Sequence, residues 1–398
     1  MRATWEFVST KNIVFGYGSV EKLDHILQRF NARNVLIITD QGIRQAGILE
    51  RVASLLQGYH VMVYDQAVPE PPIQSALECY EHARSVQQTD VIIGLGGGSS
   101  IDLAKVVALL MAHGGHPRDY FGENKVPGPV APLIAIPTTA GTGSEVTSIT
   151  VLTDTENNLK TGISDNHLRP AVALLDPTLT LKLPPYVTAC SGIDALAHAI
   201  EAYMAKPFQY IEADGELLFQ GANPISDALA IQAIKLIADH LVVAVQQGSK
   251  LEARSQMLLG SLLAGMAFSN AGTAAAHALA YPIGGLIKAP HGELTGLLLP
   301  YVVEFNAHAA KEKVRNIAQA FGLPSEGIST KEVKDRLVAA LFDLLKSIGL
   351  PTKLSEIGIH KEQLPEIAKK ALTIERLIRN NPRIPTQEGF EQLLTKAL

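Results

Sequence analysis

The first half of the chain alternates short apolar runs with segments of helical periodicity. Asn34–Thr39 (NVLIIT) and Asp90–Ile93 (DVII) are rich in β-branched residues, and each is followed by a turn signal and a helical pattern. A third run, Leu133–Ile136 (LIAI), is stopped by Pro137. This alternation is typical of α/β domains and predicts a mostly parallel sheet with helices on both faces.

The pattern changes after Leu183-Pro184-Pro185. From there to the end of the chain, Ala, Leu and Ile recur at helical spacing and strand-like runs almost vanish. We therefore expect an α/β dinucleotide-binding domain over residues 1–184 and an all-helical metal and substrate domain over residues 185–398. A length of 398 residues agrees with two domains, or three.

Two segments of the predicted helical half are less regular. Residues 206–221 (KPFQYIEADGELLFQG) resemble an insertion between two helices. We expect a surface loop here, and the alternative is a lid. The following Asn223-Pro224-Ile225-Ser226-Asp227 predicts a turn that leads into a helix.

Composition and charge narrow the class of protein. Apolar residues make up 47% and charged residues 18%, which excludes a disordered, collagen-like or coiled-coil chain. The formal net charge of −5 gives no reason to expect nucleic acid as a partner. Cys79 and Cys190 have no C-x-x-C spacing, and Met1–Phe15 lacks the apolar stretch of a signal peptide. We expect a reducing, cytoplasmic location.

One segment raises the possibility of a membrane span. Residues 258–287 contain no Lys, Arg, Asp or Glu. They do contain Asn270, His277, Pro282 and five glycines, a composition that suits tightly packed interior helices better than contact with lipid. We expect no membrane association.

A glycine-rich turn follows the second apolar run. In Gly94–Ser100 (GLGGGSS), three consecutive glycines would let the backbone approach a ligand, and the helix that follows offers free N–H groups to a pyrophosphate. The spacing is not G-x-G-x-x-G, so a purely structural turn is the alternative.

A second polar loop supports the phosphate interpretation. Thr138–Ser144 (TTAGTGS) follows the third run and brings hydroxyls and two glycines to the same expected sheet edge, where α/β sheets bind ligands. Asp40 ends the first run, where a carboxylate can bind an adenosine ribose and disfavour a 2′-phosphate. Its alternative role is to cap the next helix.

The helical half contains candidate metal ligands. Asp194 and His198 are four residues apart and would share one helix face in an otherwise apolar stretch. His277 and His291 are further candidates. One carboxylate and three imidazoles would suit Fe²⁺ or Zn²⁺ and leave room for a substrate oxygen. Singly, each of these residues is more often a core or surface group than a ligand.

Together these motifs resemble one family. GGGSSID (96–102), PTTAGTGSEVT (137–147), GIDALAHAIEAY (192–203) and the pair of His277 and His291 are similar to the iron-dependent, or group III, alcohol dehydrogenases. The resemblance implies the dehydroquinate synthase-like fold, in which an α/β nucleotide-binding domain precedes an all-helical metal domain. It also implies metal ligands at Asp194, His198, His277 and His291.

The same resemblance implies a set of cofactor-binding residues. Asp40 would bind the ribose, and the glycine loop (Gly94–Ser100) would bind the pyrophosphate. The threonine loop (Thr138–Ser144) would line the cofactor, and Lys160 would lie near the nicotinamide ribose. The full set is Asp40, Gly96, Gly97, Gly98, Ser99, Asp102, Thr138, Thr139, Thr142, Ser144 and Lys160.

The chain also departs from the family pattern. Where many members carry a second histidine four residues after the one matching His277, this chain has Tyr281. Tyr281 and His277 are the expected catalytic residues, and the proton path through Tyr281 is left open. Tyr281, residues 68–71 (VPEP) and residues 220–227 (QGANPISD) look more like the branch that includes hydroxyacid-oxoacid transhydrogenase.

These observations predict a metal-dependent NAD oxidoreductase that interconverts a small alcohol and its aldehyde or ketone, with hydride transfer in the interdomain cleft. The expected cofactors are NAD and Fe²⁺, with Zn²⁺ as the alternative metal. A hydroxyacid-oxoacid transhydrogenase and a dehydroquinate-synthase-like lyase remain alternative functions. The expected partners are a small-molecule alcohol, aldehyde or hydroxyacid and further copies of the chain, as a homodimer or higher homo-oligomer.

Overall fold

The computed structural model describes residues 1–398 except 86–88, 157–158 and 213–214. It divides into an α/β unit, Val8–Leu183, and a helical unit, Met1–Phe7 with Pro184–Leu398. The sequence pattern groups residues 1–184 together, whereas the first seven residues lie in the helical unit. There the Glu6 backbone N–H donates to Gln220 at 2.9 Å, and the Trp5 ring packs edge-on against Phe208.

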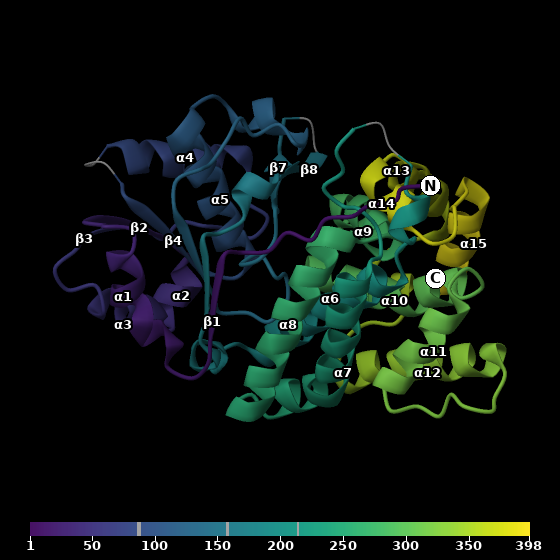
Figure 1. The fold of residues 1–398 in the computed structure, drawn as a ribbon. Helices are drawn as coiled ribbons and strands as arrows, with labels where there is room; N and C mark the ends of the chain where they lie inside the picture. Colours follow the sequence, from purple (N-terminus) through teal and green to yellow (C-terminus); the bar gives the residue numbers. More distant parts are fainter. Residues whose placement is uncertain (86–88, 157–158, 213–214) are drawn as a thin grey trace. The chain divides into compact units, whose positions relative to one another are not determined.

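A six-stranded, wholly parallel sheet forms the centre of the α/β unit (Figure 1). In spatial order its strands are β1 (Asn12–Phe15), β9 (Val172–Leu175), β6 (Leu133–Pro137), β4 (Val91–Gly96), β2 (Asn34–Ile38) and β3 (His60–Tyr64). Central strands β2, β4 and β6 are the three apolar runs found in the sequence, which confirms the predicted parallel sheet.

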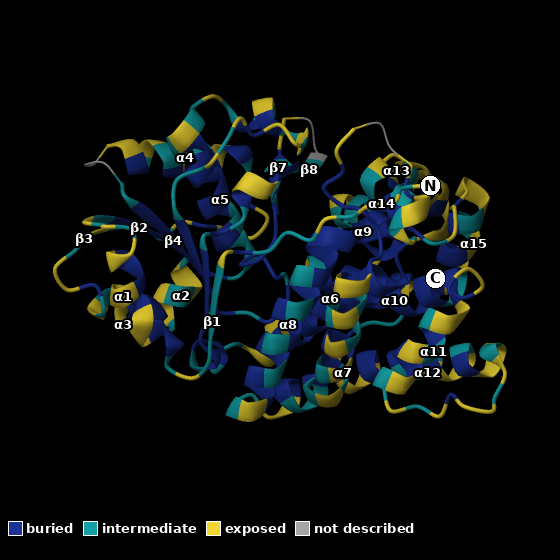
Figure 2. Ribbon diagram, viewed as in Figure 1, coloured by how far each residue is buried: buried dark blue, intermediate teal, exposed yellow. Residues whose placement is uncertain are grey.

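Helices cover both faces of this sheet, and its central strands β2, β4 and β6 are almost wholly buried (Figure 2). Along β2, Leu36 packs with the helices on one face while Val35 and Ile37 pack with those on the other. The first face is covered by α4 (Ile73–Arg84) and α5 (Gly98–His113), and the second by α1 (Leu23–Gln28) and α3 (Ile48–Ser54). The short α2 spans Gln41–Gln45. Side chains that alternate between two buried faces explain why the runs are continuously apolar.

A second, three-stranded sheet completes the α/β unit. It contains β5 (Gly122–Glu123), β8 (Leu159–Ser164) and β7 (Ile149–Asp154), with β7 and β8 antiparallel. Four 3-10 helices also belong to this unit: Ser19–Lys22, Pro117–Tyr120, Asn166–Leu168 and Pro177–Thr180.

The second unit is helical, as predicted, and its described residues contain no named strand. Its helices are α6 (Pro185–Met204), α7 (Pro224–Gln246), α8 (Leu251–Ala271), α9 (Ala275–Leu286), α10 (His291–Asn306), α11 (Lys311–Ala320), α12 (Thr330–Ser347), α13 (Leu364–Leu372), α14 (Glu375–Asn380) and α15 (Gln387–Ala397). Three 3-10 helices are also present: Phe208–Tyr210, Leu354–Ile357 and Lys361–Gln363.

The stretch 206–221 differs from a simple surface loop. Leu217, Leu218 and Phe219 are buried, so this end of the stretch is part of the packed unit. Positions 213–214 within it lie outside the described residues. Asn223 then caps α7 by accepting a hydrogen bond from the Ser226 N–H, which confirms the predicted turn into a helix.

Among the residues that the structure describes, two helical segments meet the length and composition expected of a membrane span. One is α7, and the other is α8 and α9 taken together, although these two meet at an angle of 98°. The central helices of globular proteins pass the same test. The part of α8 that lies in the charge-free stretch, residues 258–271, is mostly buried, which agrees with the expected interior packing.

Candidate active site

Helix α6 presents three ionisable side chains to the interior of the helical unit. Asp194, His198 and Glu201 follow at intervals of four and three residues, so they share one helix face. Their exposed fractions are 4%, 6% and 3%. Burial of two carboxylates requires compensating partners, because an unpaired buried charge is costly.

Glycine allows the first turn of α10 to approach α6 closely. A Cβ on Gly292 would lie 2.1 Å from the Cys190 carbonyl oxygen, and a Cβ on Gly296 would lie 2.7 Å from the Ile193 side chain. Thr295 on the same helix donates a 2.8 Å hydrogen bond to Asp194 Oδ1. The close contact therefore brings His291, at the start of α10, beside the buried face of α6.

The structure brings Asp194, His277 and His291 together. One ligand atom from each lies within 4.8 Å of the others, and His277 Nε2 is 3.8 Å from Asp194 Oδ1. His198 borders this cluster but is not one of the three residues whose ligand atoms lie within 4.8 Å of one another. Its Nδ1 lies 3.9 Å from Asp194 Oδ2, and its ring stacks on His277 at 4.6 Å and on Phe268 at 4.2 Å. His198 stays a predicted fourth ligand.

The chemistry of these side chains fits a divalent metal ion. His277 Nδ1 bonds Glu201 Oε2 at 2.5 Å, whereas its buried Nε2 has no hydrogen-bond partner among the residues that the structure describes. A proton held on Nδ1 by a carboxylate leaves the Nε2 lone pair available for coordination. One carboxylate oxygen with two or three imidazole nitrogens is a donor set for Fe²⁺ or Zn²⁺.

Glu201 is a functional residue that the sequence analysis missed. Besides His277, it accepts hydrogen bonds from the backbone N–H groups of Ala274, at 3.1 Å, and Ala276, at 2.6 Å. It thus fixes both the first turn of α9 and the ring of His277. The signal in the sequence was an acid on the face of α6 that carries Asp194 and His198, within an apolar stretch.

Tyr281 lies one helical turn after His277, next to His291. Its ring is tilted against that of His291 with centroids 5.6 Å apart, and its hydroxyl accepts a 3.2 Å hydrogen bond from Arg376 Nη2. The phenol is therefore held beside the candidate metal ligands rather than only packed against Pro282.

The two glycine-containing loops of the α/β unit meet as expected, because they follow the neighbouring strands β4 and β6. The Thr138 N–H donates to the Gly96 carbonyl at 2.9 Å. A Cβ on Gly98 would lie 2.7 Å from the Thr142 side chain, and Gly97 faces Thr139. Gly96 has φ +145°, a conformation that side chains rarely adopt.

Asp40 has the alternative role foreseen for it, that of a helix cap. Its Oδ1 accepts a 3.0 Å hydrogen bond from the Ile43 N–H at the start of α2, and its Oδ2 accepts one from Ser100 Oγ at 3.1 Å. The Ser100 contact also brings the carboxylate to the glycine loop.

Asp102 fastens the threonine loop to α5. Its carboxylate accepts hydrogen bonds from Ser144 Oγ at 2.8 Å and from the Val151 N–H at 3.1 Å. Burial raises the pKa of Asp102, while the nearby Lys105 opposes that shift. Burial also lowers the pKa of Lys105 to about 8 and raises the pKa of Glu145 to about 7.

Lys160 and Ser99 both contact Glu70, in the loop before α4. Lys160 Nζ pairs with the Glu70 carboxylate, and Ser99 Oγ accepts a hydrogen bond from the Glu70 N–H at 3.3 Å. Lys160, on β8, therefore lies near Ser99 at the start of α5, in the same unit.

Comparisons with known proteins match nearly the whole chain. A family model described as iron-containing alcohol dehydrogenase matches residues 10–177, and one described as the C-terminal part of the Fe-containing alcohol dehydrogenase family matches residues 188–398. The NAD-dependent methanol dehydrogenase of Bacillus methanolicus is 37% identical, with 97% of each chain covered.

Solved structures agree in fold. The crystal structure of a 1,3-propanediol oxidoreductase superposes with a TM-score of 0.93 at 34% identity, covering 99% of this chain and 100% of that one. Sulfoacetaldehyde reductase from Bifidobacterium kashiwanohense, solved in complex with NAD⁺, gives a TM-score of 0.88 at 29% identity, covering 100% of this chain and 99% of that one.

Proposed function

Because this chain belongs to the iron-containing alcohol dehydrogenase family, we propose that it oxidises a small primary alcohol to the aldehyde with NAD and catalyses the reverse reduction. The observation that carries the proposal is the convergence of Asp194, His277 and His291, with an available nitrogen on His277. Both matching family models describe alcohol dehydrogenases, which favours this activity over the dehydroquinate-synthase-like lyase.

The metal end of the site has a defined division of roles. Asp194, His277 and His291 would hold the ion, with His198 as the fourth ligand. An iron ion held there would supply a Lewis acid for the alcohol oxygen. Glu201 fixes the orientation and protonation of His277, and Thr295 orients Asp194. Tyr281, held by Arg376, would orient the substrate oxygen or pass its proton through the phenol.

We assign the nucleotide to the two loops of the α/β unit. Gly96, Gly97, Gly98 and Ser99 would hold the pyrophosphate at the N-terminus of α5. Thr138, Thr139 and Thr142 would line the nucleotide, and Lys160 would reach the nicotinamide ribose. Asp102 and Ser144 support this arrangement by joining the second loop to α5. The Asp40 carboxylate would receive the adenosine ribose while continuing to cap α2.

A substrate panel tests the proposed activity. Iron-loaded protein is assayed for NADH formation with methanol, ethanol, 1-butanol and 1,3-propanediol, and for NADH oxidation with the matching aldehydes. A parallel arm pairs a 4-hydroxyacid with a 2-oxoacid and adds no free NAD. Turnover of an alcohol with free NAD supports the proposal. Turnover in the hydroxyacid–oxoacid arm alone would assign the chain to transhydrogenation.

Location and assembly complete the proposal. We propose a cytoplasmic enzyme, supported by the free and buried state of Cys79 and Cys190. We also propose a homodimer or higher homo-oligomer. β1 forms one edge of the six-stranded sheet, and such an edge can pair with a second copy. Fractionation of producing cells tests the cytoplasmic location, and light scattering on purified protein tests the oligomeric state.

A further inference from the structure

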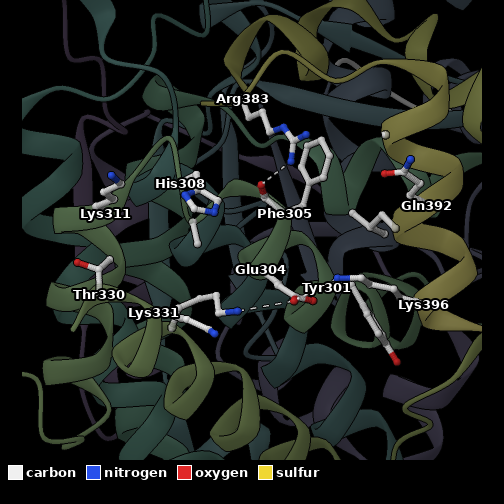
Figure 3. Close-up of a pocket in the computed structure, with 14 residues that line it drawn as sticks. Tyr301, Glu304, Phe305, His308, Lys311, Thr330, Lys331, Arg383, Gln392 and Lys396 are labelled. Atoms are coloured by element: carbon white, nitrogen blue, oxygen red, sulfur yellow. Dashed lines mark hydrogen bonds and ion pairs between the residues drawn. The ribbon is translucent and has the colours of Figure 1, made fainter. Parts of the chain in front are cut away.

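A cavity of about 500 Å³ lies between helices at the C-terminal end of the helical unit. It is lined by residues from α10, α11, α12 and α15 and from the segment after α14 (Figure 3). A volume of this size suits a small-molecule ligand. The cavity shares none of its lining residues with the candidate metal site, which lies at the opposite end of α10.

The lining of this cavity is strongly basic. It contains five cationic side chains and a single carboxylate, although the whole chain carries a net charge of −5. The cations are Lys311, Lys331, Lys334, Arg383 and Lys396, and the carboxylate is Glu304. His308 and Thr330 add further polar groups to the wall.

The single carboxylate cannot balance these cations. Glu304 is shared by Lys334, at 3.7 Å, and Lys396, at 3.2 Å, and Lys334 also contacts Asp335. The other three cations, Lys311, Lys331 and Arg383, have no ion pair among the described residues. All three residues are exposed, and an anion bound among them would be attracted by three positive charges at once.

Arg383 is already oriented for such a role. Its guanidinium stacks on the Phe305 ring at 4.0 Å and donates to the Phe305 carbonyl at 3.2 Å (Figure 3). These contacts restrict a long side chain before any ligand binds, which lowers the entropic cost of anion binding.

We propose that this cavity binds a small molecule carrying two or more phosphate groups. Three unpaired cations around one volume match a multivalent anion better than a single carboxylate, and the planar guanidinium of Arg383 pairs well with phosphate oxygens. Lys311, Lys331 and Arg383 are the anion-binding residues, and Glu304 keeps Lys334 and Lys396 in place.

Binding is measured by calorimetry on the metal-loaded enzyme saturated with NAD, which keeps its nucleotide loops occupied. Fructose 1,6-bisphosphate is the probe, with tricarballylate and acetate as carboxylate comparisons at constant ionic strength. We expect the bisphosphate to bind with a Kd below about 1 mM and acetate not to bind. Stronger binding of tricarballylate than of the bisphosphate would overturn the assignment to phosphate.

Matched variants locate the binding. The double variant Lys311→Gln, Lys331→Gln should weaken binding by about tenfold or more. The control Lys361→Gln, Lys369→Gln removes the same charge from exposed positions outside the cavity and should leave binding unchanged. Equal weakening in both double variants would show a general charge effect and overturn the proposal.

A footprint of lysine reactivity gives a second, site-specific readout. Acetylation of Lys311 and Lys331, followed by mass spectrometry, should slow when the bisphosphate is added, while Lys361 and Lys369 should react at an unchanged rate. Unprotected cavity lysines at saturating bisphosphate would contradict the proposal, wherever else the compound binds.

Discussion

The Nδ1 atom of His277 lies 2.5 Å from the Glu201 carboxylate, so an acid on α6 fixes a histidine on α9. Because the same carboxylate accepts the N–H groups of Ala274 and Ala276, the first turn of α9 and the orientation of the imidazole depend on one side chain. The Nε2 lone pair is thereby aimed at the space shared with Asp194 and His291.

Substitution of Glu201 should weaken metal binding. Glu201→Gln keeps an oxygen that can accept hydrogen bonds but removes the charge that favours the Nδ1–H form of His277. We expect Fe²⁺ affinity to fall by about 10- to 100-fold, as is usual when the partner of a metal-bound histidine is changed. Competition with a chromophoric chelator measures the change.

Glu366→Gln is the matched control, because Glu366 is exposed and pairs with Lys370 on α13. It should bind Fe²⁺ like the wild type. Unchanged affinity in Glu201→Gln would mean that Glu201 serves only to begin α9.

Loss of the Tyr281 hydroxyl should affect the rate and leave the metal in place. Tyr281→Phe keeps the ring against His291 but removes the group that Arg376 holds. We expect kcat to fall by about tenfold to a hundredfold, less than the largest losses seen for an acid–base residue. Steady-state kinetics and iron content are measured on the same samples. Wild-type kinetics at every pH tested would assign Tyr281 a packing role.

The charge of Asp40 should control cofactor preference. Asn is as good a helix cap as Asp, so Asp40→Asn keeps the α2 cap and removes only the charge that faces a 2′-phosphate. The ratio of kcat/KM for NADP to that for NAD should rise about tenfold or more. Asp24→Asn, at an exposed position on α1, should leave the ratio unchanged. A wild-type protein that prefers NADP would exclude the ribose role.

Glu145 makes the stability of the protein depend on pH. Burial raises its pKa to about 7 from an ordinary 4.5, and Lys105 opposes the shift. Between these two values the folded state binds a proton that the unfolded state has lost, so this group's contribution to stability falls as pH rises through that window.

Glu145→Gln removes that dependence. The free energy of unfolding of the variant minus that of the wild type should therefore rise by roughly 1–3 kcal/mol from pH 5 to pH 8. Urea unfolding at the two pH values measures it, with the exposed Glu50→Gln on α3 as control. The same difference from wild type at both pH values would show that Glu145 is not protonated in the folded protein.

The sequence was most informative where local pattern decides structure. Apolar runs predicted β2, β4 and β6, and the i, i+4 spacing placed Asp194 and His198 on one helix face. It could not predict how closely His198 approaches the other candidates, because that depends on how α6, α8 and α9 pack. Nor could it assign Met1–Phe7, whose contacts to Gln220 and Phe208 join positions about 200 residues apart.

The dependence of alcohol oxidation on iron tests the account most directly. NADH formation from the best alcohol of the panel is measured on protein stripped by a chelator and again after Fe²⁺ is restored. We expect the rate to fall about a hundredfold or more on stripping and to return with about one equivalent of Fe²⁺ per chain. In His277→Ala the metal should not restore it, whereas His25→Ala, at an exposed position on α1, should behave like the wild type. Full turnover by stripped protein, or by His277→Ala, would contradict the proposed site.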